Sequence, residues 1–136
     1  AASDVYKRQF VLCQGFVPEL ARKIYGGSDI FLMPSKSEPC GLSQMVALRY
    51  GSIPVVRETG GLKDSITDSG DGKGNGFTFQ TYDTQDMLNS VHRAIYAYNE
   101  SKDGWKVLVE RAMACDNSWG RSANDYIRLY KQLINS

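Results

Sequence analysis

The chain has 136 residues, 42% of them hydrophobic, so it can bury one core and corresponds to one domain or part of one. Sixteen lysines and arginines stand against fifteen aspartates and glutamates, and no basic block gives electrostatic support for binding nucleic acid or a membrane surface. The apolar runs are far shorter than the ~20 residues of a transmembrane helix, and no signal-peptide pattern precedes them.

The three cysteines, Cys13, Cys40 and Cys115, are odd in number and form no CxxC pair. This spacing predicts neither a disulfide framework nor a zinc site, and it fits a reducing cytoplasm best. Cys13 and Cys115 are interpreted as small core residues, and His92 as a surface residue.

Short apolar runs alternate with helical periodicity over residues 10–79. Strands are predicted at residues 10–13, 29–33, 53–56 and 76–79. Helices are predicted at residues 18–25, with Pro18 in the first turn, and at residues 42–50, ending at Gly51. The apolar residues of the second helix are Leu42, Met45, Val46 and Leu48. This alternation predicts an α/β fold with a Rossmann-like parallel sheet.

Three helices follow the last strand. Asp83 or Thr84 caps the first, and Ser118 caps the third. Their apolar faces consist of Met87, Leu88, Val91 and Ile95; of Trp105, Leu108, Val109 and Ala112; and of Trp119, Ala123, Tyr126, Ile127, Tyr130 and Leu133. The helical spacing favours core packing for Trp105 and Trp119. Residues 1–9 have no periodicity and are interpreted as a leader, so the domain is expected to span residues 10–136.

Ligands of such sheets bind beyond the carboxyl ends of the strands, where we expect the loops 35–41, 58–61 and 70–76. The first loop leads into a helix. The free N–H groups of Gly41, Leu42 and Ser43 would form an anion site suited to a phosphate, which Gly41 lets approach closely. The glycine-rich loop 70–76 is interpreted as a turn. Lys36 and Arg57 flank the first two loops, either as phosphate contacts or as solvated charges.

Glu38 is the only carboxylate of the first loop. A phosphate would repel it, so there it would face sugar hydroxyls or positive charge developing at a reacting carbon. A sugar diphosphate across this loop would place its phosphates on the helix end and its sugar against Glu38. The alternative is an acid that stabilises the helix dipole. Spacing alone leaves both interpretations open.

Three motifs also resemble a known family: IYGGSDIFLMP at residues 24–34, SKSEPCGLSQ at residues 35–44 and RETGGLKD at residues 57–64. Together they closely resemble the C-terminal domain of bacterial glycogen synthases and plant starch synthases. These are retaining glycosyltransferases of the GT-B fold, which consists of two Rossmann-like domains. The resemblance covers about residues 10–136. It implies part of the C-terminal, nucleotide-sugar-binding domain, ending in three helices.

The resemblance assigns roles to single residues. Glu38 would be the active-site acid near the donor glucose, and Cys40 would line the same pocket. Gly41, Leu42 and Ser43 would hold the distal phosphate through their backbone. Phe16 falls where the family often has a tyrosine that stacks on adenine. Thr59 and Gly60 would lie beside the phosphates and the sugar.

The implied reaction is transfer of glucose from ADP-glucose to the non-reducing end of an α-1,4-glucan such as glycogen, with retention and without a metal or cofactor. The location would be cytoplasmic, or the plastid stroma in a plant. The N-terminal domain and the upstream arginine and lysine of the family are absent from this sequence, so the chain alone is expected to be inactive. The apolar face at residues 126–134 is expected to favour self-association.

Two alternatives to this function remain open at the level of the sequence. One is a glycosyltransferase that uses a UDP- or GDP-sugar and another acceptor. The other is a non-catalytic module that binds a nucleotide or a glucan.

Overall fold

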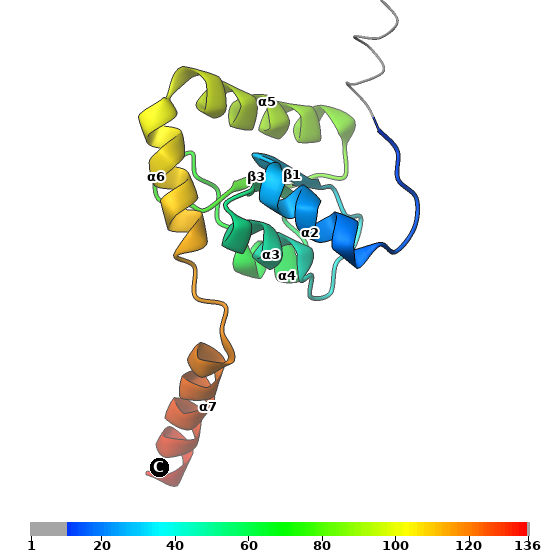
Figure 1. Cartoon of the computed structure of the whole chain (residues 1–136). Helices are drawn as coiled ribbons and strands as arrows, with labels where there is room; N and C mark the ends of the chain where they lie inside the picture. The colour runs from blue at the N-terminus through cyan, green and yellow to red at the C-terminus, as the bar shows by residue number, and fades with distance from the viewer. Residues whose placement is uncertain (1–10, 136) are drawn as a thin grey trace, which may run out of the picture.

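The computed structural model describes residues 11–135 and shows a small parallel sheet with helices packed around it (Figure 1). The elements follow in the order α2 (Pro18–Gly27), β1 (Ile30–Met33), α3 (Ser43–Tyr50), β2 (Ile53–Arg57), α4 (Gly61–Ser65), β3 (Phe77–Phe79), α5 (Thr84–Glu100), α6 (Lys102–Met113) and α7 (Trp119–Ile134). Within residues 11–135, no helix is long and apolar enough to cross a membrane.

The strands lie in the order β1–β2–β3, and both pairs are parallel. Ile30 pairs with Ile53, and Arg57 pairs with Phe79, so all the strands end at one edge of the sheet. Residues 53–56 of the central strand are all buried, as expected for a parallel strand with a neighbour on each side. The predicted α/β class with a parallel sheet is therefore confirmed.

The helices α3, α5 and α6 pack around the core of the described residues. α3 contacts β1 and β2, α5 contacts β3 and β2, and α6 packs against α3 and α5. Figure 1 shows α5 along one side of the sheet, with α6 descending from its end. The buried apolar cluster consists of Leu48, Ile53, Val55, Val56, Leu62, Ile66, Phe77, Ala94, Leu108 and Ala112. Trp105 packs against this cluster, which confirms its predicted place.

Two local predictions need correction, and one short helix was missed. Residues 11–13 form no strand, whereas Phe10 lies outside the described residues. The helix α4 was not predicted, because five residues are too few to show a helical period. In α3 the buried residues are Gln44, Ala47 and Leu48, while Leu42 and Val46 of the predicted apolar face are exposed.

Asp83 caps α5. The sequence predicted either Asp83 or Thr84 as this cap, and the structure selects Asp83. Its carboxylate accepts hydrogen bonds from the backbone N–H groups of Gln85 and Asp86, at 2.8 and 3.2 Å. Asp86 in turn accepts hydrogen bonds from the N–H groups of Gln80 and Thr81, at 3.0 and 2.8 Å. The start of α5 is thereby fixed to the segment that follows β3.

Side chains bind the outer edge of β3. The N–H of Thr78 donates to Asp68 at 2.8 Å, and its carbonyl accepts from Arg93 at 2.8 Å and from Ser90 at 3.1 Å. Arg93 also donates to both carboxylate oxygens of Asp68, each at 2.8 Å. Partial burial by itself would raise the pKa of Asp68. The hydrogen bonds from Arg93, Thr78 and Gly70 outweigh it and lower the pKa from 3.8 to about 2.

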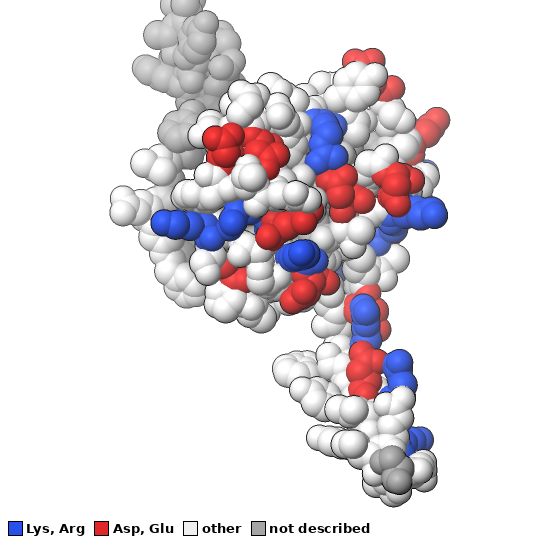
Figure 2. Space-filling view, turned by 180° about the vertical axis from the view of Figure 1, so that it is seen from behind, with Lys and Arg blue, Asp and Glu red and all other residues white. Residues whose placement is uncertain are grey.

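The last helix, α7, projects away from the rest of the molecule (Figure 1). It has no buried residue, and Trp119 is 88% exposed, so the predicted core packing of Trp119 is wrong. Figure 2 shows the charged side chains of α7 along one side of the helix and uncharged ones along the other. The apolar face at residues 126–134, which is expected to favour self-association, is exposed.

Of the remaining predictions for single residues, those for Cys115 and His92 are confirmed and that for Cys13 is wrong. Cys115 is half-buried and packs against the core, as predicted, whereas Cys13 is exposed and is not a core residue. His92 is exposed, as predicted.

Candidate functional site

The carboxyl edge of the sheet carries one loop from each strand. Residues 34–42 follow β1, residues 58–60 follow β2, and residues 80–83 follow β3. The loop 70–76, which was expected at this edge, leads into β3 and therefore lies at the amino end of that strand. Its interpretation as a turn is consistent with a location outside the candidate site. The third loop of the candidate site is instead residues 80–83, which follow β3.

The first two loops touch through their backbones. The N–H of Gly61 donates to the carbonyl of Glu38 at 3.2 Å. A Cβ at Gly60 would overlap the same carbonyl, and a Cβ at Gly61 would overlap the carbonyl of Cys40. Gly60 also has a φ of +46°, which other residues rarely adopt. The two glycines of the TGGL motif thus permit a contact that no side chain could tolerate.

The N-terminus of α3 is open beside this contact. Leu42 is the N-cap residue, but no side chain forms a capping hydrogen bond there, and the Leu42 side chain is 68% exposed. Gly41, just before it, has a φ of +70°. The first turn of a helix has N–H groups without a partner in the helix, together with the positive end of its dipole. Geometrically, this end of α3 suits an anion.

Glu38 is half-buried in the loop before α3. Among residues 11–135, its carboxylate makes no hydrogen bond or ion pair, so it does not cap α3 through a hydrogen bond. Cys40 is exposed in the same loop, Ser43 begins α3, and Thr59 lies half-buried in the second loop. The structure therefore brings Glu38, Cys40, Gly41, Leu42, Ser43, Thr59 and Gly60 to one edge of the sheet.

Phe16 lies apart from this group in the sequence, two residues before α2. Its side chain is 95% exposed, and it makes no ring contact with another aromatic residue of the described chain. The ring is therefore not part of the core, which leaves it free to contact a ligand.

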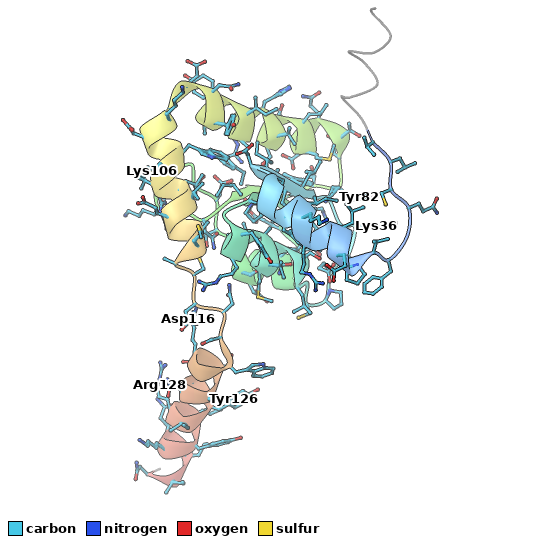
Figure 3. The ribbon with its side chains drawn as sticks, viewed as in Figure 1. Lys36, Tyr82, Lys106, Asp116, Tyr126 and Arg128 are labelled. Carbon is cyan, nitrogen blue, oxygen red and sulfur yellow. The ribbon has the colours of Figure 1, made fainter. Side chains whose placement is uncertain are left out.

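Tyr82 completes a cluster that the sequence did not indicate. Its ring lies under two cations, with Lys36 Nζ at 5.9 Å and the guanidinium carbon of Arg57 at 5.8 Å from its centroid. Figure 3 shows Lys36 and Tyr82 close together at the edge of the molecule. Arg57 also donates to the carbonyl of Lys36 at 2.7 Å. Lys36 follows β1, Arg57 ends β2 and Tyr82 follows β3, so only the assembled sheet brings the three residues together.

Other features of the chain bear on cofactors. Within residues 11–135, no group of three or more histidine, cysteine, aspartate or glutamate side chains is placed to hold a metal ion. Glu58 is engaged elsewhere, because its carboxylate accepts a hydrogen bond from the hydroxyl of Thr78 at 2.7 Å. Glu38 is thus the carboxylate of the first two loops that remains available.

A parallel sheet with an open helix N-terminus, an unpaired acid and flanking cations at its carboxyl edge defines a Rossmann-like protein that can bind an anionic ligand there. Residues 7–104 match the family described as "Glycosyl transferases group 1", so the chain belongs to this family of glycosyltransferases.

The sequences of curated relatives support the same family assignment. The chain is 48% identical to a glycogen synthase of Moorella thermoacetica over 95% of its own length and 27% of that protein. It is 54% identical to a glycogen synthase of Bacillus cereus (strain ATCC 10987), over 88% of its length and 25% of that protein. The chain thus spans about a quarter of the length of these curated relatives.

Solved structures show the same fold. The catalytic domain of starch synthase IV from Arabidopsis thaliana, bound to ADP and acarbose, superimposes with a TM-score of 0.82 at 41% identity, over 99% of this chain and 30% of that one. A sucrose-phosphate synthase from Thermosynechococcus elongatus shares the fold, with a TM-score of 0.63 at 22% identity. These comparisons confirm the resemblance to glycogen and starch synthases and the assignment to the GT-B fold class.

Proposed function

We propose that the chain is the donor-binding part of a glycogen or starch synthase. The complete protein would transfer glucose from ADP-glucose to the non-reducing end of an α-1,4-glucan, with retention of the anomeric configuration. The observation that carries the proposal is the contact between the two loops, which holds the unpaired acid Glu38 beside the open N-terminus of α3. The similarity to a starch synthase bound to ADP and acarbose supports the choice of donor and acceptor.

In this proposal each part of the site has one task. The backbone of Gly41, Leu42 and Ser43 binds the distal phosphate through N–H groups and the dipole of α3. When the bond between the anomeric carbon and the diphosphate breaks, its electron pair leaves with the diphosphate, and positive charge develops on the sugar. The Glu38 carboxylate faces that charge and the sugar hydroxyls. Because the helix end and cationic side chains neutralise the diphosphate, the proposal requires no metal ion.

The remaining predicted residues contribute to the binding of the donor. Phe16 stacks on the adenine, Cys40 lines the sugar pocket, and Thr59 and Gly60 lie beside the phosphates and the sugar.

We propose further that residues 10–136 are part of a C-terminal domain, with residues 1–9 outside it. An N-terminal domain would supply the acceptor-binding wall of the cleft, and an upstream arginine and lysine would bind the diphosphate. The relatives, about four times as long as this chain, support a further domain in the complete protein. The three free cysteines, Cys13, Cys40 and Cys115, fit a reducing cytoplasm.

Replacing Glu38 tests the proposed chemistry. In the complete protein, Glu38→Ala should lower turnover by orders of magnitude and leave ADP affinity nearly unchanged, because the carboxylate acts on the sugar and not on the phosphates. The measurement is incorporation of radiolabelled glucose from ADP-glucose into glycogen, with ADP affinity from calorimetry. Glu110→Ala is the matched control, since Glu110 is an exposed glutamate of α6. Normal turnover of Glu38→Ala would return Glu38 to a role in stabilising the helix.

The same assays separate the alternatives. Faster transfer from UDP- or GDP-glucose than from ADP-glucose would replace the proposed donor. Binding of glucan without any heat on addition of ADP would indicate a non-catalytic glucan module.

A further inference from the structure

Gln44 is a polar residue in the interior of the domain. It lies in the first turn of α3, and its exposed fraction is 0%. Burying an amide costs free energy unless hydrogen bonds compensate for the water it loses. The partners of Gln44 therefore indicate what the buried amide stabilises.

The amide nitrogen of Gln44 binds the loop that contains Glu38. It donates to the carbonyl of Gly41 at 2.9 Å and lies 3.5 Å from the carbonyl of Cys40. It also donates to the hydroxyl of Ser65 at 3.0 Å. Carbonyl oxygens only accept hydrogen bonds, so these partners fix which end of the amide is the nitrogen.

Ser65 extends this connection to the second loop. It ends α4, and its hydroxyl donates to the carbonyl of Gly61 at 2.6 Å. The N–H of Gly61 donates in turn to the carbonyl of Glu38. The path from Gly41 through Gln44, Ser65 and Gly61 thus returns to Glu38 and closes a ring of hydrogen bonds between the two loops.

The backbone of Gly41 packs closely against the Gln44 side-chain amide. A Cβ at Gly41 would lie 2.6 Å from Gln44 Oε1 and 3.0 Å from Nε2, closer than a side chain normally allows. Gln44 Oε1 is buried and has no hydrogen-bond partner in the described part of the chain. A buried acceptor without a hydrogen bond costs free energy of folding. A side chain that carries such a group is retained where the surrounding structure requires it.

We propose that Gln44 and Ser65 are positioning residues, which fix the Glu38 loop relative to the open N-terminus of α3. Neither needs to contact the substrate. Through the ring of hydrogen bonds they set the distance between the Glu38 carboxylate, which faces the sugar, and the N–H groups at the start of α3, which face the phosphates. This inference rests on the proposed function, because the separation matters only if one ligand spans both groups.

The test uses the complete protein with Gln44→Met, which keeps the length of the side chain and removes its donor, and with Ser65→Ala. We expect kcat to fall about 10- to 100-fold in each, since a displacement of about 1 Å at a reacting group can cost that much. ADP affinity should change less than about threefold, because the first turn of α3 remains. The double variant should be hardly worse than the more severe single one, because both act through one ring. Ser65→Thr, which retains the hydroxyl, should keep most of the activity.

Leu108→Ala is the control for loss of stability, because Leu108 is a buried core residue of α6. A folded Gln44→Met with the kcat of the wild type would overturn the proposal. So would a Leu108→Ala variant, destabilised to the same unfolding temperature, with an equal loss of kcat.

Hydrogen exchange of the substrate-free protein provides a readout that does not depend on activity. Gln44→Met should accelerate exchange at residues 38–42 and 59–61, whereas Leu108→Ala should not. Should the wild type transfer no glucose, the proposed function fails, and exchange alone decides the positioning role. Unchanged exchange in both loops would then overturn it.

Discussion

Among the aromatic residues of the described chain, Phe16 has the most exposed side chain. If it stacks on adenine, Phe16→Ala should weaken ADP binding by about 1–3 kcal/mol, the usual contribution of a base stacked on an aromatic ring. Phe16→Tyr, which keeps the ring, should bind ADP about as well as the wild type. Calorimetry with ADP measures both.

The stability of these variants provides the control. The exposure of Phe16 predicts that Phe16→Ala leaves the unfolding temperature unchanged. Loss of the fold would show that the ring packs against protein and would refute the stacking role.

The site residues that the sequence indicated differ from those that it did not in how far along the chain their partners lie. Glu38, Gly41 and Gly60 belong to short motifs, so the sequence itself shows them together. Gln44 was missed because its polarity predicts a solvent-facing position on a helix, and only the partners supplied by another helix explain its burial. Tyr82 was missed because its cluster forms only when three strands end at one edge.

At the level of elements, Asp68 and Arg93 join the loop before β3 to α5. The lowered pKa of Asp68 means that the folded protein holds its carboxylate ionised more strongly than the unfolded chain does. The stabilisation from this pair should therefore be complete above about pH 4 and should be lost as the pH falls from 3.8 towards 2.

Asp68→Asn tests this expectation. At pH 7 the variant should unfold at lower urea concentration than the wild type, and the difference should shrink as the pH approaches 2. Asp64→Asn is the matched control, because Asp64 is exposed on α4 and its side chain has no partner among the described residues. A constant difference at every pH would assign the effect to packing and not to the charge of Asp68.

The apolar side of α7 gives a second expectation at this scale. Tyr126 and Arg128 point to different sides of the helix in Figure 3, and the tyrosine side also carries Ile127 and Tyr130, all exposed. We expect the isolated chain to self-associate through this side. Tyr130→Glu should lower the apparent mass in sedimentation, whereas Gln132→Glu, on the charged side, should not. Equal effects of the two variants would assign the change to net charge.

The elements themselves could be predicted to different extents. β1, β2, β3 and the three last helices lie within a few residues of their predicted positions, because strand and helix periods are local properties. The packing of α7 could not be predicted, since the same apolar stripe is consistent with a buried helix or with an exposed surface. Trp119 shows this most clearly, because its spacing was that of a core residue.

For the whole molecule, we expect that the 136-residue chain alone transfers no glucose. Retaining transfer requires a donor enclosed away from water with its leaving diphosphate neutralised. In the proposed function, the described residues would form one side of such a site. ADP should bind weakly, through α3 and Phe16. Incorporation from radiolabelled ADP-glucose above a Glu38→Ala control would show that the proposal assigns too much to residues outside this chain.

The side chains along β3 also determine in which direction the sheet can grow. Thr78 already uses its N–H and its carbonyl on Asp68, Arg93 and Ser90, so another strand could pair there only by displacing an ion pair. The outer edge of β1 pairs with no strand among residues 11–135. A strand added by a longer polypeptide is therefore expected beside β1, where it would displace no ion pair. When nothing occupies that edge, it is the place where a second molecule can attach by strand pairing.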